Sequence, residues 1–538
     1  MARTPLLSFL RRALRKAELA RRTTDGPSRR QILHGALGAA ALVPLVAACG
    51  DNLGGAPVAK VAVVGAGTAG LHAAYRLAQA GVDVTVYEAS GRTGGRMFTD
   101  RGPYPDGKVI ELGGELVDSG HAVMRGLCDE LGLTLDDLPF DTDGLAQDTF
   151  YFRGALVSEA TLVSEFTPLA ARMATAAIAG EDDDDEFARL DAMSIPAWLA
   201  AADGGNLPAG SLIRLILEEA YVGEYGLEVE RQSAWNLLYL IDFDTPDPFH
   251  IFGDSDERYH IHEGSQAVPD ALAARLGGQV VLEHALTALA TTDDGATLTF
   301  ATAAGDVTVE VDRVVLALPF TTLRRVDLTA AELSDDKRMM ITTLGYGTNA
   351  KLMMRFGTRP WRTGSNANGS SITDLGELHA TWETSRGYPG VDGILTNFVG
   401  GDRGVAMGQG TAEERAAEVL PWLDTIFPGT SAAYTPGSAV RQHWPTAPFA
   451  LGSYACYEVG QAAFAGREGE AEGKLHFCGE HTSVDAQGYM EGAAETGLRA
   501  ATEVMAALGV MPGASARQLH EAAARKPRTR RHRRRRGT

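Results

Sequence analysis

The stretch from Val61 to Arg96 reads VAVVGAGTAGLHAAYRLAQAGVDVTVYEASGRTGGR, and it contains the pattern that decides the fold. A strand rich in β-branched residues leads into a turn and a helix that share three glycines: Gly65, Gly67 and Gly70. After the helix, a second strand from Val82 to Tyr87 ends on Glu88. This order of strand, turn, helix and strand predicts a dinucleotide-binding unit of an α/β fold.

Each position of the turn has a physical requirement. Gly65 makes the tight turn, Gly67 lets the backbone approach a pyrophosphate, and Gly70 lets the helix pack on the strand. Ala69 lies in the first turn of the helix, whose unpaired N–H groups and partial positive charge favour a phosphate. Glu88 follows Gly65 by 23 positions, where a carboxylate accepts hydrogen bonds from both ribose hydroxyls of an adenosine.

A second glycine-rich turn indicates which dinucleotide is bound. The sequence GRTGGR at residues 91–96 places Arg92 and Arg96 directly beyond Glu88. FAD has a second phosphate–ribityl arm that must be neutralised and threaded close to backbone, whereas nicotinamide enzymes have no general need for such a turn. We therefore expect FAD; two surface arginines in a loop are the alternative interpretation.

The combination of GxGxxG, the glutamate and GRxGGR resembles the flavin amine oxidase superfamily, which includes monoamine oxidases, polyamine oxidases, L-amino-acid oxidases and tryptophan 2-monooxygenases. The resemblance extends over residues 58 to 507 and implies two discontinuous domains. A Rossmann-like FAD-binding domain of the two-dinucleotide-binding (GR2) type is expected from residues 58–120, 265–340 and 441–510. A mixed α+β substrate domain is expected from residues 121–264 and 341–440.

The resemblance also implies further cofactor contacts. Gly113, Gly114, Glu115 and Leu116 match the segment that crosses near the flavin. The backbone of Val280 matches a contact to the adenine, although a core valine is an equal interpretation of the residue alone. Glu480 matches the carboxylate on the ribityl or ribose hydroxyls. A helix that starts after Gly488, with Tyr489 and Met490, is expected to aim its N-terminus at the N1–C2=O edge of the flavin.

Three residues match catalytic positions of the family. Tyr454 and Tyr489 correspond to the aromatic pair that stands on either side of the substrate amine and strips it of water. Lys351 corresponds to the lysine that holds a water near flavin N5 and promotes reaction with oxygen. Ser453 stands where covalent members carry a flavin-linking cysteine, with Cys456 out of that position, so the resemblance implies noncovalent FAD. No metal site is expected.

One departure bears on the substrate. Many L-amino-acid oxidases place an arginine that clamps the substrate carboxylate where this chain has Leu116. Three other residues are alternatives for that role: Arg125, Arg258 and Arg386. Glu115, Asp118 and His121 are candidates for the entry to the substrate domain, where they would favour amines or basic amino acids.

The charge of the chain is uneven. It has 49 basic and 69 acidic residues, but the first 50 and last 28 residues hold nineteen of the basic and three of the acidic ones. Residues 51–510 therefore carry 30 basic and 66 acidic residues, a net charge of −36. A body this acidic disfavours nucleic acid and favours cationic substrates. Cys128, Cys456 and Cys478 show no metal spacing and are expected to be buried small hydrophobes.

The two ends have signals of their own. Residues 28–33, SRRQIL, match a twin-arginine export pattern, and a moderately apolar run follows from Gly35 to Ala48. The run ends in VAAC at residues 46–49, which resembles a lipobox whose Cys49 would be lipidated. We therefore expect residues 1–49 to be a signal peptide and the protein to be an exported cell-envelope lipoprotein; a cytoplasmic protein with a basic leader is the alternative. The basic segment 511–538 is expected to be disordered.

These observations together predict a flavin amine oxidase. Hydride would pass from the carbon that bears the amine to flavin N5, the imine would hydrolyse, and oxygen would be reduced to hydrogen peroxide. The substrate would be a primary amine or an L-amino acid, and the oligomeric state is open. Three alternatives remain: a quinone-linked dehydrogenase, an enzyme similar to tryptophan 2-monooxygenase, and a non-catalytic FAD-binding lipoprotein.

Overall fold

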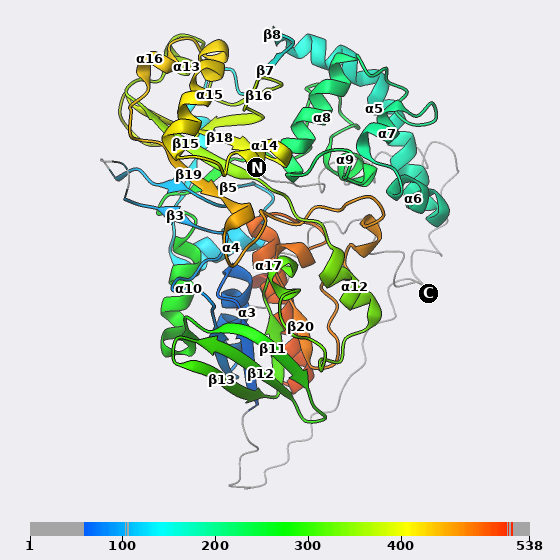
Figure 1. The fold of residues 1–538 in the computed structure, drawn as a ribbon, viewed down its shortest axis with the longest axis vertical. Helices are drawn as coiled ribbons and strands as arrows, with labels where there is room; N and C mark the ends of the chain where they lie inside the picture. Colours follow the sequence, from blue (N-terminus) through cyan, green and yellow to red (C-terminus); the bar gives the residue numbers. More distant parts are fainter. Residues whose placement is uncertain (1–58, 103, 105–106, 514, 516–517, 520–538) are drawn as a thin grey trace, which may run out of the picture.

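The computed structural model describes residues 59–102, 104, 107–513, 515 and 518–519. The predicted signal peptide and lipobox, residues 1–49, lie outside the described residues, as does most of the basic segment 511–538. In Figure 1 the chain forms a lower part with the segments nearest both ends of the described chain and an upper part with most of the middle segments.

A five-stranded parallel sheet forms the centre of the lower part. Its strands lie in the order β10 (Val280–Val281), β2 (Asp83–Tyr87), β1 (Lys60–Val64), β14 (Arg313–Leu316) and β20 (Leu475–Phe477). The predicted unit is confirmed as β1, α3 (Thr68–Gln79) and β2. Along β1, Val61 and Val63 pack on one side of the sheet, and Ala62 and Val64 pack on the other. Burial on both faces is the reason that this strand is a continuous apolar run.

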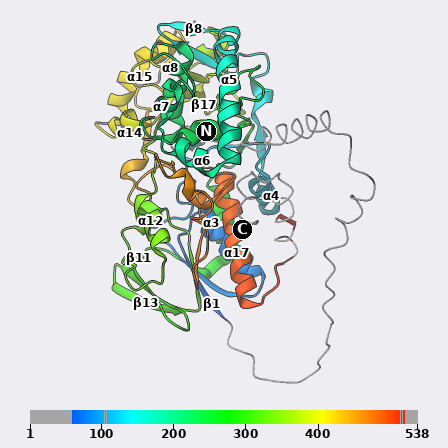
Figure 2. The same ribbon diagram turned by 90° about the vertical axis from the view of Figure 1, so that its right-hand side faces the viewer.

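Each face of the parallel sheet is covered by a different layer. One face carries α3, α4 (Ala122–Leu131), α10 (Ala267–Leu276) and α17 (Met490–Leu508). The other face carries the antiparallel strands β11 (Ala285–Thr291), β12 (Ala296–Thr302) and β13 (Gly305–Val311), with α11 (Phe320–Leu323) and α12 (Asp335–Thr343). Helix α17 lies beside α3 in both side views (Figures 1 and 2).

Helix α4 packs in the lower part, whereas the predicted domain division assigns residues from 121 onward to the substrate domain. Val123 and Leu127 pack in the same core as α3 and α17. Glu491 of α17 accepts hydrogen bonds from the backbone N–H groups of Val123 (3.1 Å) and Met124 (2.7 Å), and so caps α4. The first crossing into the upper part therefore follows α4.

A seven-stranded sheet forms the frame of the upper part. Its order is β19 (Val440–His443), β15 (Ala350–Phe356), β18 (Gly393–Val399), β17 (Ala380–Glu383), β16 (Ser371–Thr373), β7 (Thr149–Phe152) and β8 (Ala155–Val157). All neighbours pair antiparallel except β16 and β7. Strands β7 and β8 thus bring part of the first predicted substrate-domain segment, residues 121–264, into one sheet with residues 350–443.

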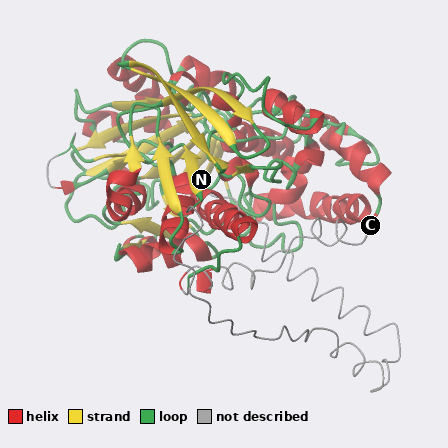
Figure 3. Cartoon of the chain, turned by 90° about the horizontal axis from the view of Figure 1, so that it is seen from below, coloured by secondary structure: helices red, strands yellow, loops and turns green. Residues whose placement is uncertain are grey.

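Helices cover this sheet and extend beyond it. One group is α5 (Glu159–Asp182), α6 (Asp184–Asp191), α7 (Ile195–Ala200), α8 (Leu212–Tyr225) and α9 (Ala234–Leu240). A second group is α13 (Pro360–Thr363), α14 (Gly401–Ala406), α15 (Ala412–Ile426) and α16 (Thr430–Ala433). Seen from below, the strands gather in the left part of the view, and helices fill the right part (Figure 3). No helix among the described residues is both long and apolar enough to cross a bilayer.

Short strands join the two parts. Leu116 and Val117 form β5, which pairs with β9 (Tyr259–Ile261), and β9 also pairs with β6 (Leu135–Asp137). Strand β3 (Thr99–Asp100) pairs with β4 (Ile110–Glu111).

The described start of the basic segment contacts the body, although the whole segment was predicted to be disordered. Arg76 donates a hydrogen bond to Ser515 Oγ (3.0 Å), and Leu519 packs on Leu498.

Candidate active site

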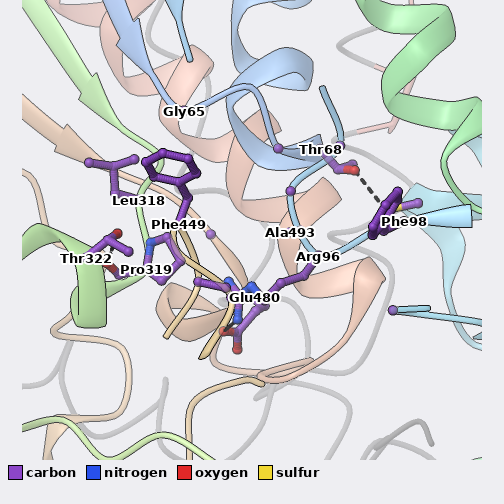
Figure 4. Close-up of a pocket in the computed structure, with 18 of the residues that line it drawn as sticks. Gly65, Thr68, Arg96, Phe98, Leu318, Pro319, Thr322, Phe449, Glu480 and Ala493 are labelled. Atoms are coloured by element: carbon purple, nitrogen blue, oxygen red, sulfur yellow. Dashed lines mark hydrogen bonds and ion pairs between the residues drawn. The ribbon is translucent and has the colours of Figure 1, made fainter. Parts of the chain in front are cut away.

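A cavity of about 680 Å³ extends from the carboxyl ends of β1 and β2 to the seven-stranded sheet. In Figure 4, Arg96 and Glu480 point toward each other, Leu318, Pro319, Thr322 and Phe449 lie on one side of them, and Phe98 lies on the other. Most predicted site residues line this cavity: Gly65, Gly67, Ala69, Glu88, Arg92, Arg96, Gly113, Gly114, Glu115, Leu116, Lys351, Tyr454, Glu480, Gly488, Tyr489 and Met490.

The glycine turn has the geometry that its sequence predicts. Gly65 adopts φ +105°, and a Cβ there would lie 2.8 Å from the carbonyl oxygen of Ala317. A Cβ on Gly70 would lie 2.0 Å from the carbonyl oxygen of Gly65, so Gly70 serves packing and does not line the cavity. Gly67 lines the cavity with nothing within 4 Å of an added Cβ. A ligand can therefore approach the backbone at Gly67, as a pyrophosphate requires.

The carboxylate of Glu88 is held at the end of β2. It accepts hydrogen bonds from Ala66 N (2.8 Å), Ser90 N (2.9 Å) and Ser90 Oγ (2.7 Å). These three neutral donors orient the carboxylate, whose charge strengthens the hydrogen bonds that it would accept from ligand hydroxyls. Val280 does not line the cavity; its neighbour Val281 accepts a hydrogen bond from Glu88 N, and residues 284–286 form the lining instead.

The two predicted arginines are positioned in different ways. Arg96 donates to Glu480 Oε1 (2.6 Å) and to the carbonyl oxygen of Ser453 (2.9 Å). Arg92 donates to the carbonyl oxygens of Thr93 and Gly95, and its guanidinium lies 3.8 Å from the ring centroid of Phe98. Arg96 therefore connects the first glycine-rich segment to the last segment of the domain.

The segment 113–114 is enclosed by the other cofactor segments. A Cβ on Gly113 would lie 1.8 Å from the carbonyl oxygen of Arg96, and a Cβ on Gly114 would lie 2.8 Å from Met490 Cγ. Met490 begins α17, whose first turn faces the cavity. The N-terminus of a helix stabilises negative charge, so this wall suits the edge of a flavin that becomes negative on reduction. The glycine cradle, the Glu88 carboxylate and this helix start together fit FAD.

Lys351 on β15 lies in a buried group of acceptors. Its Nζ donates to Glu115 Oε2 (2.8 Å) and to the carbonyl oxygens of Glu111 (2.8 Å) and Gly113 (2.9 Å). Burial opposes ionisation of Glu115, but the charge of Lys351 and its hydrogen bond hold the pKa of that carboxyl below its usual value. The three protein acceptors account for the three ammonium protons, so a water beside Lys351 would have to share one of them.

Both predicted tyrosines line the cavity. Tyr454 donates its hydroxyl hydrogen bond to the carbonyl oxygen of Glu224 on α8, and the ring of Tyr489 lies edge-on to His121, with 5.2 Å between centroids. Ser453 also lines the cavity and donates to Asn349 Oδ1 (2.5 Å). Cys456 is buried and is not among the lining residues; Cys128 and Cys478 are also buried, as predicted.

Phe398, Gln442 and Trp444 are among the lining residues that were not identified from the sequence. Phe398 on β18 and Gln442 on β19 are the direct strand neighbours of Lys351 on either side. Trp444, which follows β19, donates from its indole N–H to the carbonyl oxygen of Leu112 (3.1 Å). Trp444 lies ten positions before Tyr454, and this proximity was a usable signal; the other two residues depend on strand register.

The residues considered as carboxylate anchors or entry residues lie outside the cavity, with the exception of Glu115. Arg125 donates to the carbonyl oxygen of Ser119, Arg258 pairs with Asp137, and Arg386 donates to the carbonyl oxygen of Glu383; none of the three is a lining residue. Asp118 and His121 are buried and close to each other. Among the described lining residues of the upper part, Lys351 is the only basic one, and Glu115 neutralises it.

Comparison with known proteins agrees with this geometry. The pattern of the flavin containing amine oxidoreductase family matches residues 68–505. An L-amino-acid oxidase from Siganus canaliculatus is 25% identical over 470 residues, which cover 82% of this chain and 85% of the relative. The flavin-containing amine oxidase A of Canis lupus familiaris is 26% identical over 474 residues, with 84% and 85% covered. The structure of a putrescine oxidase bound to putrescine shares the fold, with a TM-score of 0.70 and 24% identity over 83% of this chain and 99% of that one.

The chain therefore belongs to the flavin containing amine oxidoreductase family. It is an FAD-dependent oxidoreductase that acts on CH–NH₂ groups by oxidative deamination. The described residues contain no group of three His, Cys, Asp or Glu side chains that could hold a metal ion.

Proposed function

We propose that the substrate is a primary amine without an α-carboxylate. The observation that carries the proposal is the absence, among the described lining residues of the upper part, of any basic side chain other than the neutralised Lys351. A substrate carboxylate would be desolvated beside Leu116 with no counter-ion, which costs several kcal/mol. Amine oxidases and L-amino-acid oxidases both occur among the relatives, so this feature of the cavity is the basis for choosing between them.

The chain's own side chains bind and orient such an amine. When bound, FAD supplies the ring that accepts hydride from the carbon bearing the amine, and the resulting imine hydrolyses. The rings of Tyr454 and Tyr489 restrict the amine to one orientation and exclude water. Phe398 and Leu116 add apolar surface to the same cavity. The first turn of α17 stabilises the negative charge that reduction brings, by about 1 kcal/mol.

The FAD is held without a covalent bond. Ser453 and not a cysteine lines the cavity at the position that is linked in covalent members, and Cys456 lies outside the lining. Denaturation in acid should therefore release all of the flavin into the supernatant. Flavin that stays with the precipitated chain would contradict this proposal.

Oxygen is the proposed acceptor, with hydrogen peroxide as its product. The oxidases among the relatives support oxygen, while a quinone acceptor is the second candidate because a lipid anchor would bring the enzyme to the membrane. One peroxide formed per amine consumed supports oxygen, and amine consumption without peroxide, dependent on added quinone, supports the alternative.

The chain is proposed to be exported by the twin-arginine route and anchored through Cys49. The sequence SRRQIL at residues 28–33 and VAAC at residues 46–49 support this proposal. A protein that binds FAD must fold around it in the cytoplasm, and export of folded proteins suits that requirement.

The proposed substrate class is tested by introducing into the cavity a basic side chain that can bind a substrate carboxylate. Leu116→Arg should raise kcat/KM for L-phenylalanine by at least about tenfold relative to 2-phenylethylamine, since a charged hydrogen bond to the carboxylate is worth about 1.5–3 kcal/mol. Leu116→Met is the matched control and should leave the ratio unchanged. A wild-type enzyme that already prefers L-phenylalanine would contradict the proposal.

A further inference from the structure

The ammonium of Lys351 is enclosed by acceptors of two kinds. The carbonyl oxygens of Glu111 and Gly113 hold its position but carry no net charge. Glu115 Oε2 is the third acceptor and is the only carboxylate oxygen that accepts from Nζ among the described residues. The side chains of Lys351 and Glu115 are only 4% and 3% exposed, so solvent screens their charges poorly.

The other ionisable groups nearby, Glu111 and His260, interact mainly with each other. The Glu111 carboxylate accepts from Ser265 N (2.8 Å), Ser265 Oγ (2.7 Å) and Thr99 Oγ1 (2.8 Å), and lies 3.3 Å from His260 Nε2. The ring of Trp382 lies 5.2 Å from Lys351 Nζ and carries no charge. The charge of Lys351 at the cavity wall is therefore cancelled mainly by Glu115.

We propose that Glu115 is a positioning residue for Lys351. Its carboxylate holds the Lys351 ammonium against the Gly113 backbone and cancels the charge of that ammonium at the wall of the flavin site. An unpaired cation at this wall would favour the negative charge that two-electron reduction adds to a flavin. The neutral pair of Lys351 and Glu115 does not favour that negative charge. Glu115 therefore keeps the reduction potential of the bound FAD lower than an unpaired Lys351 would make it. This inference requires FAD binding but not the proposed substrate class.

The test compares two variants that separate charge from shape. Glu115→Gln keeps the length and an acceptor oxygen but removes the charge, whereas Glu115→Asp keeps the charge and shortens the side chain. Each FAD-loaded protein is equilibrated anaerobically with a reference redox dye and without any amine, so that the result does not depend on the substrate. Glu115→Gln should shift the equilibrium toward reduced flavin by at least about fivefold, and Glu115→Asp should stay within about twofold of the wild type.

A charge-neutral double variant completes the experiment. Glu115→Gln with Lys351→Met removes both charges, so its equilibrium with the dye should return to within about twofold of the wild-type value. This variant also tests the proposal if Glu115→Gln alone does not retain FAD, because a buried pair is commonly replaced more easily than one of its members. A shift for Glu115→Asp as large as that for Glu115→Gln, or a double variant that keeps the shift of the single one or does not retain FAD, would overturn the proposal.

Discussion

Arg96 and Glu480 are separated by 384 positions in the sequence, yet Arg96 Nη1 donates to Glu480 Oε1 at 2.6 Å. Arg96 ends the first glycine-rich segment, and Glu480 follows β20, the last strand of the parallel sheet. Glu480 also accepts a hydrogen bond from Gly488 N (2.9 Å), directly before α17. One carboxylate therefore holds together the first and the last segments that line the cofactor cavity.

Removing the Arg96 charge should lower both the stability of the fold and the affinity for FAD. Arg96→Gln leaves the buried Glu480 carboxylate without its cation, and we expect the free energy of unfolding to fall by about 2 kcal/mol and FAD to bind more weakly. Chemical denaturation and flavin titration measure the two effects. Arg189→Gln, which breaks an exposed pair with Glu186, is the control and should cost less than about 0.5 kcal/mol. Equal losses in both variants would show that the pair does not join the segments.

Lys351 and Tyr454 should affect different half-reactions. Lys351→Met removes the ammonium that, by resemblance to the family, promotes the reaction of reduced flavin with oxygen, so reoxidation should slow by at least about tenfold, or about 1.4 kcal/mol of barrier. Tyr454→Ala removes the ring that orients the amine and should instead slow flavin reduction. Stopped-flow measurement of each half-reaction checks both. Losses of equal size in both steps for both variants would indicate purely structural roles.

His72 should give the fold a defined pH dependence. Burial and the charge of Arg76 lower the pKa of His72 from 6.5 to about 3, and the neutral ring donates to the carbonyl oxygen of Ala494 and accepts from Arg76 Nε. Between these pKa values the unfolded chain binds a proton that the folded chain does not, so stability falls as the pH falls below 6.5. His72→Gln should reduce the slope of unfolding free energy against pH between 5 and 6 by about 1 kcal/mol per unit. A slope equal to that of the wild type would contradict this assignment.

Export should depend on the paired arginines at the start of the chain. Arg29→Lys combined with Arg30→Lys should leave folded, yellow protein in the cytoplasm, because the twin-arginine route reads that pair. Cys49→Ala should abolish labelling by a fatty acid and release exported protein from the membrane fraction. Fatty-acid labelling that persists in Cys49→Ala would exclude the lipobox.

Local sequence patterns were enough to predict the dinucleotide-binding unit. The backbone conformation at Gly65, the close approach of Gly70 to the Gly65 carbonyl and the periodicity of α3 are set within about 30 residues, so they can be recognised from sequence. The row formed by Phe398, Lys351 and Gln442 depends on the register of three strands, which no local pattern specifies. The ion pair of Lys351 with Glu115 joins residues 236 positions apart. The sequence therefore identified each of them as a candidate site residue but could not predict that they pair.

The most direct measurement is the anaerobic bleaching of the purified enzyme's flavin by matched substrate pairs. Each pair consists of an amine and the L-amino acid that differs from it by the α-carboxylate: 2-phenylethylamine with L-phenylalanine, and putrescine with L-ornithine. We predict that at least one amine reduces the flavin at least about a hundredfold faster than its amino acid, which corresponds to about 2.7 kcal/mol for an unpaired carboxylate in the cavity. Faster reduction by the amino acid in both pairs would contradict the proposed substrate class, and an enzyme whose flavin no amine or amino acid bleaches would contradict the account as a whole.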